Sequence, residues 1–241
     1  MKKLLLLFAL FAVALSATAS PTERWLDPEC FAENRAPMRT SFIVFPTASE
    51  AVPENDYTRS PFYRTLNGEW AFLRAERPGA EPEGFFRTGY DDSSWGVMPV
   101  PGIWELNGYG DPVYVNVGYA WRGNFRNDPP HVPDTENHVG SYRRTFDVPA
   151  GWAGKQVTLS IGSATSNVYV WINGRFVGYS EDSKLAAQFD VTKYLRPGEN
   201  LVALQIYRWS DGTYLEDQDF WRLSGIARSV ELVARDRAHL E

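Results

Sequence analysis

The sequence is poor in the residues that build cross-links and metal centres. Cys30 is the only cysteine among 241 residues, so no internal disulfide can form and the fold must be held by its core. His131, His138 and His239 are scattered through polar sequence and lack the spacing of zinc ligands. A disulfide framework is therefore excluded, and the histidines are expected on the surface or in loops.

Basic tracts, internal repeats and a sustained helical period are also missing. The net charge is −6, and removal of two leader lysines would leave 22 basic against 30 acidic side chains, about −8. An acidic chain without a basic tract argues against nucleic acid and against anionic membrane surfaces as partners. The length suffices for one large β-domain or two small domains.

The first 19 residues are typical of a targeting segment. Lys2 and Lys3 precede an apolar run at 4–15, and small residues at 17–19 form a cleavage site before Ser20. The apolar run is short for a bilayer span, and no cysteine follows it closely enough for a lipoprotein anchor. We expect a cleaved signal peptide at 1–19 and a secreted, periplasmic protein without membrane attachment. A membrane anchor is the less favoured alternative.

Residues 20–66 are rich in Pro, Asn, Arg and Ser and show no lasting periodicity, yet they carry apolar anchors such as Trp25 and Phe42. A disordered tail would rarely hold so many. We expect an extended arm that packs on a neighbouring surface of the chain or of a partner.

Aromatic residues make up 15% of the sequence, including nine Trp, and core burial is the more common role for each ring.

From residue 67 the pattern changes to short alternating strands separated by turn signals. Asn173-Gly174 is the dipeptide best suited to a type I′ hairpin, because both positions need positive φ. Spacing of this kind predicts an all-β fold, an antiparallel β-sandwich of jelly-roll type that covers 67–236. The expected strands are 68–74, 141–148, 156–161, 167–172, 175–179, 201–207 and 229–233.

The stretch 208–222 is acidic and aromatic, with an arginine at each end. Its four carboxylates lie within nine positions: Asp211, Glu216, Asp217 and Asp219. Carboxylates accept hydrogen bonds from sugar hydroxyls and ligate hard cations. A binding site and a solvated acidic loop with core aromatics are equally compatible with this composition. A glycosidase acid and nucleophile pair fits less well, since it needs a fixed separation and opposed environments.

The segment 99–137 is long, rich in Gly, Pro and Asn, and weakly patterned. Such segments in a compact domain are usually functional or pack on another element. Within it, Asn116 offers both a donor and an acceptor to a sugar hydroxyl. A turn asparagine is the more common explanation when Asn116 is considered alone.

The chain resembles the N-terminal sugar-binding domain of family 2 glycoside hydrolases. Residues 209–219, Trp-Ser-Asp-Gly-Thr-Tyr-Leu-Glu-Asp-Gln-Asp, have the form found in the large bacterial β-galactosidases rather than in β-glucuronidases or β-mannosidases of the family. The resemblance implies a galactose-binding-like jelly roll with an N-terminal arm. It covers nearly the whole chain after the leader, through segments that follow the family pattern in order: 66–72, 100–105, 112–117, 171–183, 190–200 and 223–228.

The resemblance implies that Asn116 and Asp219 belong to a galactose pocket shared with a catalytic barrel. By motif position, Asn116 bonds sugar hydroxyls, and Asp219 contacts galactosyl hydroxyls and helps hold a sodium ion that barrel residues complete. Magnesium is expected only in the catalytic domain. One departure follows Asn116, where Gly-Tyr-Ala-Trp at 118–121 replaces the Thr-Tyr-Pro that the family often has.

The family's acid/base and nucleophile glutamates lie on the barrel, beyond residue 241, so no catalytic residue is assigned here. We expect the N-terminal portion of a secreted β-galactosidase that acts on terminal β-D-galactosides, inactive when isolated. The remaining domains or a complementing fragment would complete it, and the complete enzyme would be a homo-oligomer. Two alternatives stay open, a free-standing carbohydrate-binding module and an interaction domain that recruits a complementing chain.

Overall fold

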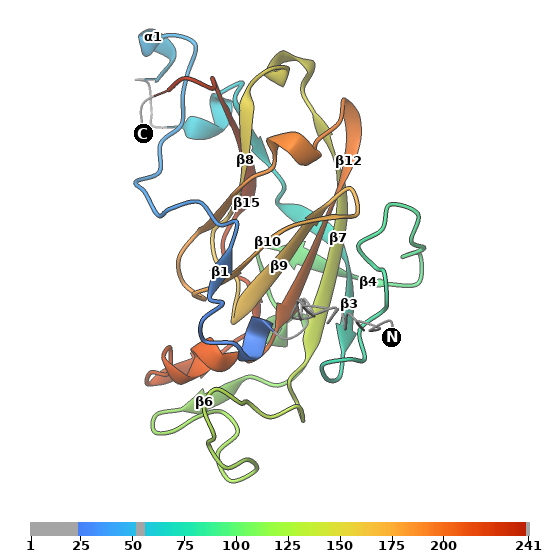
Figure 1. Cartoon of the computed structure of the whole chain (residues 1–241), viewed down its shortest axis with the longest axis vertical. Coiled ribbons are helices and arrows are strands. Elements are labelled where there is room, and N and C mark those ends of the chain that lie inside the picture. The colour runs from blue at the N-terminus through green and yellow to red at the C-terminus, as the bar shows by residue number, and fades with distance from the viewer. Residues whose placement is uncertain (1–23, 52–55, 240–241) are drawn as a thin grey trace, which may run out of the picture.

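Two antiparallel sheets form the layers of a β-sandwich in the computed structural model, which describes residues 24–51 and 56–239 (Figure 1). The larger sheet has seven strands in the order β1 (Ala32–Glu33), β10 (Arg175–Glu181), β9 (Asn167–Ile172), β12 (Gly198–Tyr207), β7 (Val139–Val148), β3 (Gly68–Ala75) and β4 (Gly96–Val100). The smaller sheet has four strands in the order β11 (Ala187–Asp190), β8 (Gln156–Ile161), β15 (Val230–Arg235) and β2 (Tyr63–Thr65). The predicted all-β fold class is confirmed.

Two short ribbons lie outside the main sheets. They pair β6 (Val113–Val115) with β13 (Phe220–Arg222), and β5 (Gly102–Ile103) with β14 (Gly225–Ile226). The described helices are short: α1 (Ala48–Ala51) and the 3-10 helices η1 (Arg24–Leu26), η2 (Tyr57–Arg59), η3 (Glu105–Asn107), η4 (Ala150–Trp152), η5 (Thr192–Tyr194) and η6 (Asp211–Tyr214). None of these helices has the length and apolar character needed to cross a bilayer. The expected signal peptide lies outside the described residues.

The hairpin between β9 and β10 forms where the sequence predicts it. Asn173 and Gly174 have φ of +52° and +80°, as a type I′ turn requires at both positions. The Asn173 side chain also ties the turn to the neighbouring strand. Its Oδ1 accepts from the Leu201 amide at 2.9 Å, and its Nδ2 donates to Asn200 Oδ1 at 2.7 Å. The turn therefore sets the register of β9 against both β10 and β12.

Both faces of the seven-stranded sheet are buried. On β9, Val168 and Val170 point into the core between the two sheets. The intervening Tyr169 and Trp171 lie in a second cluster on the outer face, where the ring of Phe86 stacks on Trp171 at 5.2 Å between centroids. Covering loops thus bury aromatic side chains that a two-layer sandwich would leave in solvent. Seven of the nine tryptophans are buried, which confirms the core as their usual place.

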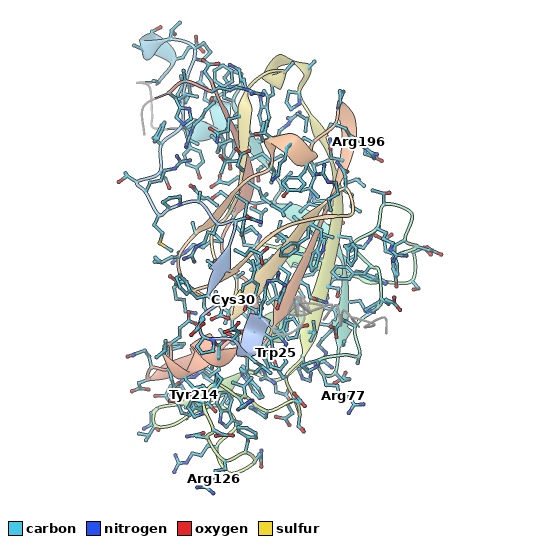
Figure 2. All side chains as sticks on the ribbon, viewed as in Figure 1. Trp25, Cys30, Arg77, Arg126, Arg196 and Tyr214 are labelled. Atoms are coloured by element: carbon cyan, nitrogen blue, oxygen red, sulfur yellow. The ribbon has the colours of Figure 1, made fainter. Side chains whose placement is uncertain are left out.

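The N-terminal arm packs on this outer face, so the expectation that it contacts a neighbouring surface is confirmed within the chain. Trp25 of η1 is buried against Tyr207 of β12, and β1 adds to the edge of β10. Farther along, the Arg235 guanidinium lies over the Phe42 ring, 4.0 Å from its centroid. The last residues of the range expected as an arm form β2, which pairs with β15. Figure 2 shows Trp25 and Tyr214 toward the same end of the sandwich, where η1 meets η6.

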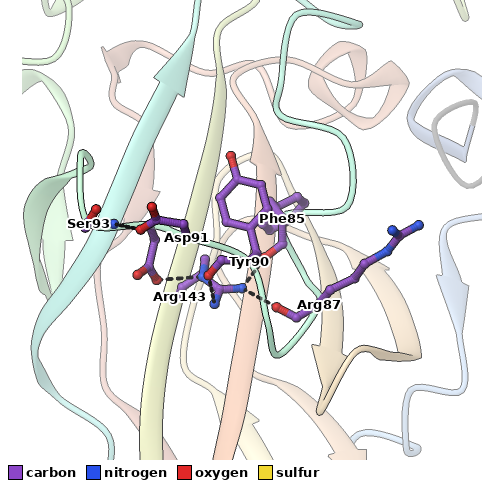
Figure 3. A network of polar contacts seen from close by, with 7 residues as sticks. Phe85, Arg87, Tyr90, Asp91, Ser93 and Arg143 are labelled. Carbon is purple, nitrogen blue, oxygen red and sulfur yellow. Dashed lines mark hydrogen bonds and ion pairs between the residues drawn. The ribbon is translucent and has the colours of Figure 1, made fainter.

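Arg143 of β7 fastens the covering loop 85–92 to the outer face (Figure 3). Its side chain is 5% exposed, and its Nε donates to Asp92 Oδ2 at 2.6 Å. The guanidinium also donates to the carbonyls of Phe85, Arg87 (3.0 Å) and Tyr90 (3.3 Å). A planar cation with several fixed donors suits such a loop, because it satisfies buried carbonyls in several directions at once.

Candidate functional site

The two residues predicted from separate stretches, Asn116 and Asp219, meet at the end of one ribbon. β6 and β13 are antiparallel, and Val115 faces Phe220 in their last pair. Asn116 directly follows Val115, and Asp219 directly precedes Phe220, so the two occupy the next facing positions. The pairing of two segments distant in sequence therefore brings together the two side chains that the family resemblance assigns to one pocket. The ribbon projects from the end of the sandwich where η6 lies (Figure 1).

Four side chains share the outer face of this ribbon. Exposure alternates along both segments, with Tyr114 and Asn116 exposed on one and Asp219 and Trp221 exposed on the other, while the intervening residues are half-buried. Because successive side chains of a strand point to opposite faces, these four lie on one side. We refer to Tyr114, Asn116, Asp219 and Trp221 as the ligand face.

Contacts within the ligand face link its aromatic and polar members. Tyr114 and Trp221 are paired in register, with ring centroids 5.5 Å apart, and are 52% and 54% exposed. The Tyr114 hydroxyl donates to Asp219 Oδ1 at 2.5 Å, and this bond raises the pKa of the hydroxyl. The Asn116 amide and Asp219 Oδ2 have no hydrogen-bond partner among the described residues. An amide and a carboxylate oxygen thus remain free beside two exposed rings.

This combination suits a sugar better than a bare cation. The amide can donate to and accept from a hydroxyl, the carboxylate oxygen can accept, and the rings offer apolar surface for C–H groups. Within residues 24–51 and 56–239, no group of three or more His, Cys, Asp or Glu side chains could hold a metal ion. Asp219 supplies one hard oxygen ligand, so further ligands of any cation there must come from elsewhere.

The carboxylates nearest to the ligand face hold the chain in place. Asp217 forms an ion pair with Arg222, and both side chains are largely buried. Glu216 accepts hydrogen bonds from the Ser183 amide, at 2.7 Å, and from the Ser183 hydroxyl. Burial raises the pKa of Glu216. Both contacts anchor the segment that leads into β13 and so fix the position of Asp219.

Asp211 lies inside the molecule, against Glu181 at the end of β10. Each residue is 7% exposed, and the Tyr179 hydroxyl donates to Glu181 Oε1 at 2.5 Å. Burial raises the pKa of Glu181 to about 9, and the adjacent Asp211 carboxyl contributes to this shift. Burial also raises the pKa of Asp211. The two carboxyls therefore share a proton at neutral pH, since two buried charges in contact would be costly.

Neither interpretation of the acidic stretch describes all of it. A solvated loop would expose its carboxylates, yet of the four only Asp219 is exposed. A ligand site built from all four carboxylates is not formed either, because Asp211, Glu216 and Asp217 are engaged internally.

The departure from the family pattern after Asn116 also has a structural basis, since Tyr119 stacks on Trp121, with ring centroids 5.1 Å apart, and carries that loop into the outer aromatic cluster.

Sequence reasoning did not single out Tyr114, Trp221 or Glu181 as site residues. The alternation of Val113-Tyr114-Val115-Asn116 was a usable signal for Tyr114, because it places the tyrosine on the same face as the asparagine. Trp221 could have been found in the same way from Asp219. Nothing local in the sequence indicates that Glu181 meets Asp211.

Residues 63–236 match the family model of the glycosyl hydrolases family 2 sugar-binding domain. The chain is 42% identical over 226 residues to a β-galactosidase of Priestia megaterium, covering 93% of this chain and 22% of the relative. It is 41% identical over 218 residues to a β-galactosidase of Lactobacillus delbrueckii subsp. bulgaricus, covering 90% and 21%. A Bacteroides uniformis β-glucuronidase structure is similar with a TM-score of 0.55 and 25% identity, covering 72% of this chain and 18% of that one.

The chain belongs to the family 2 glycoside hydrolases, of which it forms the sugar-binding domain. It spans about a fifth of the length of the curated relatives that it matches.

Proposed function

We propose that this domain supplies part of the galactoside pocket of a secreted β-galactosidase. The observation that carries the proposal is the ligand face, where Asn116 and Asp219 lie side by side with free polar atoms next to two exposed rings. Relatives named β-galactosidase at 41–42% identity over at least 90% of the chain favour galactosides over other β-glycosides. The complete enzyme would hydrolyse terminal non-reducing β-D-galactosides with retention of configuration.

The role of this chain is to bind and orient the sugar. The Asn116 amide would hydrogen-bond one hydroxyl, and the free oxygen of Asp219 would accept from another. A sodium ion at Asp219 would add a positive charge that orients hydroxyl oxygens. Its remaining ligands would come from other domains, because one exposed carboxylate cannot complete a coordination shell. Magnesium and the acid/base and nucleophile carboxylates are assigned to those other domains as well.

Exposed apolar side chains around the ligand face support a contact with the rest of the enzyme. Leu215 is 89% exposed and Val117 is 67% exposed, and both lie in the segments that carry Asp219 and Asn116. Side chains of this kind beside a half-formed pocket are expected where another domain covers it. Export through a signal peptide at 1–19 and assembly of the complete enzyme as a homo-oligomer are part of the same proposal.

Substitutions at Asn116 and Asp219 in the complete enzyme test this function. Asn116→Ala and Asp219→Asn should each raise KM for a chromogenic β-galactoside about tenfold or more, since each removes a hydrogen bond to the sugar. Asp147→Asn, at an exposed position near the C-terminal end of β7, is the matched control and should leave KM unchanged. Unchanged KM in both site variants would contradict the proposal.

A complementing interaction domain is the second candidate, and the exposed Leu215 and Trp221 favour it. Mixing the isolated domain with a catalytic fragment that lacks its N-terminal region would restore activity on this view. A free-standing carbohydrate-binding module would instead bind galactose tightly on its own. Calorimetry of the isolated domain with galactose separates the two.

A further inference from the structure

The hydrogen bond between Tyr114 and Asp219 crosses the ribbon diagonally. Tyr114 is paired with Trp221, while Asp219 lies two residues before Trp221 on the same face. The hydroxyl reaches Asp219 Oδ1 at 2.5 Å, and it is the hydrogen-bond partner of that carboxylate within the described part of the chain. One oxygen of Asp219 is therefore held and the other is free.

An exposed aspartate without such a partner would rotate freely about its side-chain bonds. Fixing a side chain before a ligand arrives removes an entropic cost from binding. The neighbouring contacts restrain the backbone of this segment through Asp217 and Glu216, but the described hydrogen bonds restrain the Asp219 carboxylate itself only through Tyr114. The tyrosine ring is in turn packed against Trp221 across the ribbon.

We infer that Tyr114 is a positioning residue for sugar binding: its hydroxyl holds Asp219 Oδ1 and leaves Oδ2 to accept from a galactosyl hydroxyl. This inference rests on the proposed function of Asp219. The Tyr114 hydroxyl needs no contact with the sugar, since it acts through the carboxylate.

Tyr114→Phe in the complete enzyme isolates the hydroxyl, because the ring and its packing on Trp221 are kept. We expect KM for a chromogenic β-galactoside to rise about tenfold, the effect of losing one hydrogen bond to a charged group, with kcat changed less than about twofold. A merely structural role would lower the unfolding midpoint without this division between KM and kcat. Tyr57→Phe removes a hydroxyl from another half-exposed tyrosine, packed edge-on to Tyr63, and serves as the control.

The double variant Tyr114→Phe with Asp219→Asn shows whether the tyrosine acts through the aspartate. If it does, adding Tyr114→Phe to Asp219→Asn changes KM less than about twofold, because the Oδ2 acceptor that the hydroxyl positions has already been replaced by an amide NH2 group, which cannot accept from the sugar. An equal rise in both backgrounds, or an unchanged KM in Tyr114→Phe alone, would overturn the inference. If Asp219→Asn itself leaves KM unchanged, the proposed function fails first, so the two failures are distinguishable.

Discussion

Trp25 stacks on Tyr207, with ring centroids 5.1 Å apart and planes inclined by 18°. The contact joins the N-terminal arm to β12 at the centre of the large sheet. The arm is thus docked by a buried tryptophan, which is 5% exposed, as well as by the two-residue pairing of β1 with β10.

Trp25→Ala should therefore release the arm. Loss of a buried tryptophan costs about 3–5 kcal/mol, more than a two-residue strand can offset. We expect the amides of Glu33 and Glu181, which lie in the hydrogen-bonded pairs between the arm and β10, to lose protection in hydrogen exchange, while those of β7 and β12 keep theirs. Phe31→Ala, at a ring that is 59% exposed, is the control and should leave protection intact. Continued protection of the arm in Trp25→Ala would show that β1 alone suffices.

Replacement of Arg143 should destabilise the whole sandwich. Arg143→Met leaves three loop carbonyls and Asp92 without their cation, and we expect a loss of about 3 kcal/mol in the free energy of unfolding. The neighbouring Arg144 donates to one carbonyl, that of Glu69, so Arg144→Met should cost less than about 1 kcal/mol. Urea unfolding measures both, and equal losses in the two variants would argue against the loop-fastening role.

The Glu181–Asp211 pair should make stability depend on pH. The pKa of Glu181 is raised from 4.5 to about 9, so the stability that it contributes is present below pH 4.5 and is lost as the pH rises toward 9. Glu181→Gln keeps a neutral donor at every pH and should flatten this decline. Urea midpoints at pH 5, 7 and 9 measure it, with the exposed Glu199→Gln as control. A decline as steep as in the parent chain would assign the effect to other groups.

The domain alone, residues 20–241, should not hydrolyse a chromogenic β-galactoside. The ligand face offers groups that can bind a sugar. The other carboxylates of the acidic stretch, those of Asp211, Glu216 and Asp217, are engaged in contacts inside the domain. Galactose should bind this isolated domain with a Kd weaker than about 1 mM, since two polar contacts contribute little net free energy. Turnover by the purified domain above that of the same preparation carrying Asp219→Asn would contradict this prediction.

The sequence predicted the long strands well and the short ones poorly. The strand expected at 156–161 matches β8 residue for residue, because six alternating positions carry a clear period. β6 and β13 have three residues each, too few for any period, and they are paired by contacts between distant segments. Asn116 and Asp219 were nevertheless proposed as site residues, through family resemblance rather than through local pattern, and their role in sugar binding stays a prediction.

Local sequence pattern did not predict that the outer face of the seven-stranded sheet is buried. The side chains at Tyr169 and Trp171 alternate with the core valines as if one face were open, but tertiary packing of the arm and loops covers them. The proton shared by Glu181 and Asp211 was missed for a related reason. Composition reveals acids, whereas their burial and mutual contact depend on how β10 and η6 meet in space.

The ribbon of β6 and β13 also has a consequence for the order of synthesis on the ribosome. Chains emerge N-terminal end first, so Asn116 leaves the exit tunnel while its facing strand is still untranslated. β7 to β12, most of the sandwich, are made in the interval between the two halves of the ribbon. A nascent chain arrested before residue 222 would lack the ligand face together with β15, the strand that joins β8 to β2 in the smaller sheet, so the ligand face and the complete sandwich form at the same late stage of synthesis.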